Sequence, residues 1–193
     1  MKKLSLFAAL GILFCSITSF AQEMNQEMTP EMKMWMEYMT PGEMHKMLEK
    51  SAGQWKAKIT MWMAPNTPPT IAEGNSVNEM IMGGRYLQSK HLSNFSGMPM
   101  EGIGLEAYDN AKKTFYSTWI DNMGTGIMFL QGKFDPAAKT ITYTGTSVDP
   151  MTGKDMQVRE TMKYLDDNHS EMEMFTIDGD NEFKSMHIAF ERK

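Results

Sequence analysis

Three charged residues stand at positions of alternating strand patterns whose same-face neighbours are apolar, namely Arg85, Asp121 and Glu160. A charge that points into a protein interior has to be paired or used, so such positions are candidates for chemistry. The neighbours that share each face are Met156, Val158 and Met162 for Glu160, Leu87 for Arg85, and Phe115 and Trp119 for Asp121. Two interpretations stay open: these groups orient a ligand or act on it, or they form a structural ion pair or face solvent.

Methionine is the second residue type with possible chemistry, since 23 of the 193 residues are Met and only one is Cys. Residues i and i+2 of a strand point to the same side, so a Met-x-Met pair can converge on a copper(I) ion, for which thioether sulfur is a suitable soft ligand. The pairs are Met61-x-Met63, Met80-x-Met82, Met98-x-Met100 and Met172-x-Met174. The alternative is that Met occupies core positions in place of Leu or Val.

Other known chemical motifs are missing from the sequence. The four histidines, at positions 45, 91, 169 and 187, lack the spacing that prepares a metal site. His187 alternates with Met186 and Ile188, so it is expected to face solvent if those two face the interior. We find no phosphate-binding loop and no nucleophile elbow. The sequence therefore predicts no metal and no cofactor.

Composition and charge bound the class of protein. With 41% hydrophobic and 22% charged residues, the chain has the makeup of one globular domain. Acidic residues (24) outnumber basic residues (19), which argues against a nucleic-acid partner, because binding to phosphate backbones requires clustered positive charge.

Residues 1–21 are typical of an export signal. Lys2 and Lys3 precede the apolar run 4–14, and the segment ends in Ser19-Phe20-Ala21, a pattern that signal peptidases cleave. We therefore expect an exported protein, periplasmic or extracellular, that begins at Gln22. No later segment is apolar enough for a membrane-spanning helix, so no integral membrane segment is expected. Cleavage also removes Cys15, which excludes disulfides and cysteine nucleophiles.

The mature chain divides into a helical segment, 22–53, and a β domain, 54–193. Methionines recur every three or four residues from Met24 to Met39, which predicts a helix whose firmest part starts at Thr29-Pro30. Thr40 and Glu43 fit a capping box and predict a second short helix. We expect both helices to cover one end of the β domain, with their methionines packed on its rim.

Beyond Gly53 the period changes to two and predicts ten strands joined by short turns. The predicted strands are 55–63, 71–82, 84–93, 101–108, 114–121, 124–133, 140–147, 155–163, 169–176 and 183–191. Short links imply antiparallel neighbours, and closure into an up-and-down barrel removes exposed edges. A barrel of ten strands is wide enough to enclose a cavity.

Several strings between residues 42 and 154 resemble a bacterial family catalogued as domain of unknown function 1579. They include GEMHKML (42–48), GGRYL (83–87), AYDN (107–110), STWIDNMGTG (117–126) and DPMTGK (149–154). The resemblance implies a lipocalin-like (calycin) all-β barrel and supplies no catalytic residue. Its motif residues become site candidates: Arg85, Tyr86, Tyr108, Asp109, Trp119 and Asp121, with Asp109 and Asn110 also suited to a turn.

These observations favour a binding protein over an enzyme, with a small apolar or amphipathic ligand held in the barrel. The expected binding residues are Arg85, Tyr86, Tyr108, Trp119, Asp121 and Glu160. Two alternatives stay open. One is an enzyme, such as a hydrolase or isomerase, that uses Glu160 or Asp121 as acid or base near Arg85. The other is a copper(I)-binding protein.

Overall fold

The computed structural model describes residues 28–193. The predicted export signal, 1–21, and the start of the predicted Met-rich helix, 22–27, lie outside the described residues. Within the described part of the chain, none of the helices has the length and apolar character needed to cross a membrane.

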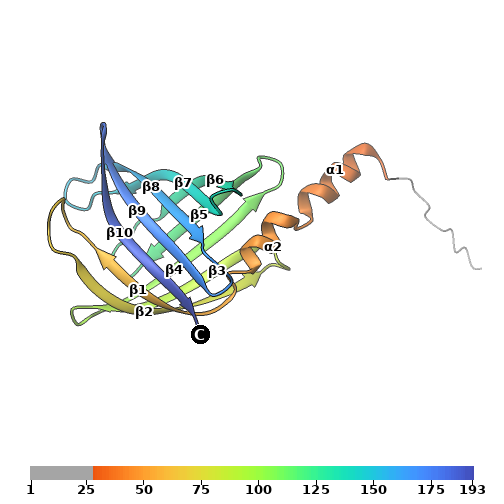
Figure 1. The fold of residues 1–193 in the computed structure, drawn as a ribbon. Coiled ribbons are helices and arrows are strands. Elements are labelled where there is room, and N and C mark those ends of the chain that lie inside the picture. The colour runs from red at the N-terminus through yellow and green to blue at the C-terminus, as the bar shows by residue number, and fades with distance from the viewer. Residues whose placement is uncertain (1–27) are drawn as a thin grey trace, which may run out of the picture.

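Ten antiparallel strands form one closed barrel (Figure 1), as the sequence predicted. Each strand pairs with the next along the chain, and β1 pairs with β10 to close the ring. The strands are β1 (Gly53–Met61), β2 (Thr70–Ile81), β3 (Tyr86–Phe95), β4 (Met98–Asp109), β5 (Thr114–Asp121), β6 (Met128–Asp135), β7 (Thr140–Val148), β8 (Asp155–Tyr164), β9 (His169–Asp178) and β10 (Asn181–Arg192).

Alternation of side chains along β1 shows why the strands close in this register. Trp55, Ala57 and Ile59 are buried, whereas Lys56 and Lys58 between them are exposed. Ile59 lies opposite Ile188 of β10, so apolar faces meet across the closing pair. A slip by one residue would turn the apolar face to solvent, so burial specifies the register.

Two helices precede the barrel, α1 (Pro30–Met39) and α2 (Glu43–Glu49). Thr29 caps α1 as predicted, because its Oγ1 accepts a hydrogen bond from the Met32 amide at 3.2 Å. The predicted role of Thr40 is wrong: its hydroxyl donates to the Met36 carbonyl at the end of α1, and Gly42 is the N-cap of α2. The Gly42 amide donates to His45 Nδ1 at 3.0 Å, so the Thr40 side chain caps the end of α1 and takes no part in the start of α2.

The two helices differ in how they meet the barrel. Leu48 of α2 is fully buried in the barrel end, with Met44 and Met47 packed beside it. In contrast, α1 buries none of its residues and extends away from the barrel (Figure 1). The expectation that both helices pack on the rim is therefore correct for α2 and wrong for α1, whose Trp35 is 62% exposed.

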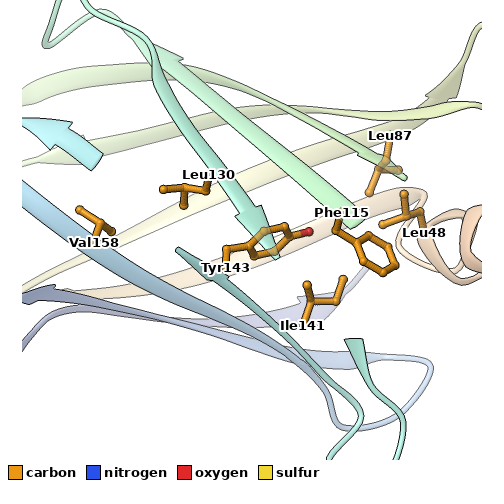
Figure 2. Packing of buried hydrophobic residues seen from close by; sticks show 7 residues of the cluster. All are labelled: Leu48, Leu87, Phe115, Leu130, Ile141, Tyr143 and Val158. Atoms are coloured by element: carbon orange, nitrogen blue, oxygen red, sulfur yellow. The ribbon is translucent and has the colours of Figure 1, made fainter. Parts of the chain in front are cut away.

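A tightly packed cluster fills the barrel half next to α2, here called the closed end (Figure 2). Its seven members come from α2 and from five strands, and all are at most 3% exposed: Leu48, Leu87, Phe115, Leu130, Ile141, Tyr143 and Val158. Gly145 permits this packing, because a Cβ there would lie 2.4 Å from the Phe129 carbonyl oxygen. The closed end thus leaves no room for a ligand of useful size.

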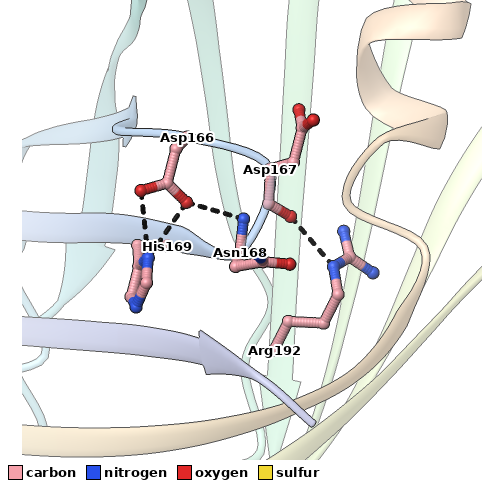
Figure 3. A network of polar contacts seen from close by, with 5 residues as sticks. All are labelled: Asp166, Asp167, Asn168, His169 and Arg192. Carbon is pink, nitrogen blue, oxygen red and sulfur yellow. Dashed lines mark hydrogen bonds and ion pairs between the residues drawn. The ribbon is translucent and has the colours of Figure 1, made fainter.

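Arg192, near the end of β10, fastens the chain around the closed end. Its Nε donates to the Asp167 carbonyl at 2.9 Å (Figure 3), and its two Nη atoms donate to the carbonyls of Ala52 and Lys50. The guanidinium also lies over the Trp55 ring, 4.2 Å from its centre. One side chain therefore joins the last strand, the β8–β9 turn and the end of α2.

Candidate functional site

The half of the barrel away from α2, here called the open end, contains a cavity of about 490 Å³. This volume lies within the range of about 300–1,000 Å³ that small-molecule sites occupy. Ten methionines line it, and they come from both the strands and the connecting loops: Met61, Met63, Met98, Met100, Met123, Met128, Met162, Met172, Met174 and Met186. Methionine is therefore the commonest residue type in the lining of the cavity.

The mouth of the cavity is marked by methionines that line it and are also exposed to solvent. They are Met63, after β1, Met98, at the start of β4, and Met123, after β5. These positions lie at the loops farthest from α2. Flexible, unbranched side chains surround the opening, and such side chains adapt to ligands of different shape.

One wall is a polar stripe along β3, formed by Ser89, His91 and Ser93. The His91 ring packs edge-on against Trp119 and Phe190, with ring centres 5.2 and 6.1 Å apart. Burial lowers the pKa of His91 to about 4, so the imidazole is neutral at neutral pH. The buried Ser93 hydroxyl makes no hydrogen bond within the described chain. This wall therefore offers neutral polar groups to a ligand.

Asp121 lies near the mouth with its carboxylate already occupied. It accepts a hydrogen bond from Trp119 Nε1 at 2.6 Å and from the amides of Met123 and Gly124 at 2.9 and 3.1 Å. The indole has room because a Cβ at Gly102 would lie 2.2 Å from its ring. Asp121 therefore positions Trp119 in the wall and holds the β5–β6 loop.

Two further carboxyl groups, Glu106 of β4 and Glu160 of β8, line the bottom of the cavity, here called the acidic floor. Leu87 lies opposite Glu106 in the strand register and Tyr143 opposite Glu160, so the floor rests directly on the closed end. The Tyr143 hydroxyl donates to Glu106 Oε2 at 3.0 Å.

The pKa values of both glutamates are raised. Burial, and next the neighbouring Glu106, raise the pKa of Glu160 to about 8. Burial also raises the pKa of Glu106, although the hydrogen bond from Tyr143 opposes this. Glu160 is only 8% exposed, and no hydrogen bond within the described chain involves its carboxyl. It is therefore a buried acid, largely protonated at neutral pH, whose polar atoms are available to a ligand.

Three of the six predicted site residues lie elsewhere. Arg85, Tyr86 and Tyr108 line a smaller groove of about 280 Å³ between the end of α1 and the rim of β3, β4 and β5. Arg85 donates hydrogen bonds to the carbonyls of Met82, at 3.0 Å, and Met39, at 2.7 Å. Its role in the structure is to hold the end of α1, in which Asn110 assists by donating to three carbonyls of residues 37–40.

The structure thus brings Trp119, Asp121 and Glu160 to one cavity and places Arg85 in a different groove. The hypothesis of an acid or base acting near Arg85 gains no support from this arrangement. Two cavity residues, Glu106 and His91, were not predicted from the sequence. Each shares a strand face with small or polar residues, Gly104 for Glu106 and Ser89 for His91, so no apolar alternation marked the inward side.

Fold and site together define a closed ten-stranded antiparallel barrel with an internal cavity that is wide enough for a small molecule. A family model described as "Protein of unknown function (DUF1579)" matches residues 40–192, and the chain belongs to that family. This confirms the resemblance seen in the sequence.

Among solved structures, the fold is similar to the crystal structure of Rv2717c from M. tuberculosis. The TM-score is 0.60 at 12% identity, over 80% of this chain and 99% of that one. A redesigned beta barrel matches at a TM-score of 0.40 and 13% identity, over 76% of this chain and 94% of that one. A search of curated proteins found no match. These likenesses concern the fold and say nothing of a ligand.

Proposed function

We propose that this protein binds a small apolar or amphipathic molecule inside its barrel, without catalysing a reaction, in the manner of a lipocalin-like carrier. The observation that carries the proposal is the cavity of about 490 Å³ with ten methionines in its lining. Dispersion and release of water favour entry of an apolar body into such a space. The neutral polar wall of β3 and the acidic floor can bind the polar end of the same molecule.

We also propose that the protein is exported. The pattern at residues 1–21 supports delivery to the periplasm or the medium, where a carrier would meet ligands from outside the cell. We expect the mature protein to begin at Gln22, which mass spectrometry of the protein recovered from each cell fraction measures. Recovery in the cytoplasm with residues 1–21 still attached would contradict this part.

Native mass spectrometry together with thermal shifts against a panel of lipids and neutral hydrophobic dyes tests binding directly. A decisive variant is Gly104→Phe, because Gly104 lines the cavity and a Cβ there meets nothing closer than 3.6 Å. The added ring points into the empty space and should abolish the ligand shift while the protein stays folded. Thr144→Phe, at an exposed position of β7, is the matched control and should bind like the parent.

Absence of a bound mass and of any thermal shift in the parent protein would overturn the proposal. Equal binding by Gly104→Phe and the parent would place the ligand outside the cavity and would overturn it as well.

Copper(I) binding is a second candidate that one observation favours. Met61, Met186 and Met174 lie directly opposite one another on the adjacent strands β1, β10 and β9, and all three line the cavity. Opposed residues of neighbouring strands have Cβ atoms about 5 Å apart, close enough for three thioethers to share one soft ion.

Anaerobic competition with a copper(I) chelator tests this candidate. A copper site predicts one ion withdrawn per chain, and loss of that ion in Met186→Leu but not in Met151→Leu, at an exposed residue outside the cavity. Full retention of the copper by the chelator would exclude it.

A further inference from the structure

We propose that the cavity selects amphipathic cations, with the ammonium group of a hydrophobic amine bound at the acidic floor formed by Glu106 and Glu160. This inference rests on the proposed binding function and names the chemical class of ligand. It concerns charge, which the size and apolarity of the cavity do not determine.

The charged groups around the cavity favour a cationic ligand over an anionic one. Its lining contains three carboxyl groups, those of Glu106, Asp121 and Glu160, while no Lys or Arg is found among the described residues that line it. His91, the single imidazole of that lining, is neutral at neutral pH because burial lowers its pKa. An ionised fatty acid or similar anion would therefore enter without a counter-charge, which is unfavourable in a poorly hydrated site.

The carboxyl groups of the cavity differ in how many hydrogen bonds they accept from the protein. Asp121 already accepts three hydrogen bonds near the mouth, and Glu106 accepts one, from Tyr143. Glu160 is 8% exposed and accepts none within the described chain. A carboxyl that faces a poorly hydrated cavity and has no hydrogen-bond partner in the protein gains hydrogen bonds when a ligand with donors enters. An ammonium group has three donors and the complementary charge.

The acidic floor lies where polar and apolar parts of the cavity wall meet. Glu160 lies between Tyr143 and Met174 in the strand register. It therefore has the tyrosine of the closed end on one side and a methionine of the cavity lining on the other. An amine whose charge reaches this floor leaves its alkyl chain among the methionines, directed toward the mouth. Head and tail thus each meet a surface of matching polarity.

Binding of an amine beside Glu160 should depend on pH. Charged and titratable groups that face Glu160 are Glu106 of β4 and Tyr143 of β7, with Tyr164 beyond them on β8. A bound cation favours ionised Glu160, so binding below the pKa of about 8 should release a proton to solvent. The affinity for an amine should therefore rise between pH 6 and pH 8, by up to about tenfold per pH unit for one proton released.

The experiment compares decylammonium, decanol and decanoate as competitors of Nile red, a neutral dye, at concentrations below micelle formation. Decylammonium should displace the dye at a concentration at least about tenfold lower than decanol, and decanoate should be weaker than both. Titration calorimetry in two buffers of different ionisation enthalpy measures the released proton.

Glu160→Gln should bring the amine to within about threefold of decanol and remove the proton release, since the ionisable partner is gone. Glu106→Gln should weaken amine binding as well and serves as the second variant. Glu73→Gln, which makes the same substitution at an exposed position of β2, is the control and should retain the amine preference.

The possible failures are distinguishable. If Nile red and decanol bind while decanoate binds as tightly as decylammonium, the cation inference is wrong and the proposed binding function stands. An amine preference that survives in both Glu160→Gln and Glu106→Gln also overturns the inference. Failure of the dye and of all three decyl compounds to bind overturns the inference together with the proposed function.

Discussion

The two halves of the barrel interior differ in how completely they are filled and in how many methionines face the space between their walls. The closed end is packed by branched and aromatic side chains such as Leu130, Ile141 and Phe115, each at most 1% exposed. The open end has ten methionines in its lining, beside buried residues such as Ile59 and Phe190, and retains a cavity of about 490 Å³. One closed sheet thus encloses a tightly packed base and a cavity with flexible side chains in its wall.

The difference shows that methionine content alone does not indicate a packed core or a metal store. Branched side chains have few rotamers and interdigitate, whereas Met has three flexible torsions and follows the shape of its partner. The acidic floor lies at the boundary, supported by Tyr143 from below and open to the cavity above.

The largest effect is expected from truncation of a closed-end residue. Leu48→Ala removes a fully buried side chain that plugs the barrel through α2, and should lower the free energy of unfolding by about 2–5 kcal/mol. Met172→Ala, at the open end, removes atoms that already border empty space and should cost about 1 kcal/mol. Urea denaturation followed by tryptophan fluorescence measures both. Equal losses would mean that the two ends are equally packed.

A second contrast uses glycines of the two halves. Gly145→Ala places a Cβ about 2.4 Å from the backbone oxygen of Phe129, which cannot move aside easily, so a loss of about 1–3 kcal/mol is expected. Gly104→Ala meets nothing closer than 3.6 Å and should stay within about 0.5 kcal/mol of the parent. Thermal unfolding of the pair is the measurement, and a reversed order would contradict the described packing.

The boundary between the halves should appear in the pH dependence of stability. The pKa of Glu160 is about 8 in the folded protein and lower in the unfolded chain, so the folded state binds more protons and stability falls as pH rises. Between pH 6.5 and pH 8 this group alone should remove about 1.5 kcal/mol.

Glu160→Gln should remove that share of the pH dependence, which denaturation of parent and variant at several pH values measures. The control is Glu73→Gln, which makes the same substitution at an exposed position of β2. Parallel profiles for the parent and Glu160→Gln would show that Glu160 is not buried as described.

The smallest effect is expected at α1, which lies beyond the closed end and contributes little to it. Asn110→Ala removes the hydrogen bonds to the carbonyls of residues 37–40 and should lower global stability by less than about 1 kcal/mol, since these groups are exposed. Hydrogen exchange should become faster in α1 but not in α2. Faster exchange in both helices would show that they act as one unit.

The strand pattern was predictable because alternation and turn chemistry are local. All ten strands occur where period two and turn residues predicted them, with ends that differ by a few residues. The helix boundary near Thr40 was not predictable, since Thr40 and Gly42 both fit an N-cap and the choice depends on His45. The exposed state of α1 was also missed, because an amphipathic pattern indicates an apolar face and not what covers it.

The candidate site could be predicted only in part. Glu160 stood out because its neighbours on β8 are apolar, and the structure places it in the cavity. Arg85 stood out for the same reason but belongs to a rim position, where it binds the end of α1. Whether such a residue lies in the cavity or at the rim depends on its position along the strand relative to the barrel axis. Strand tilt and register set that position, and the sequence of a single strand does not specify them.

By itself, the sequence determined an all-β barrel of ten antiparallel strands and membership of its family, because alternation, turns and motif strings are properties of neighbouring residues. Only the tertiary structure decided which methionines meet around one cavity, that Glu106 joins Glu160 beneath it, and that Arg85 lies outside it. The physical reason is that closure of the barrel brings together residues far apart in the chain. Their shared burial then sets the charge and size of the space between them.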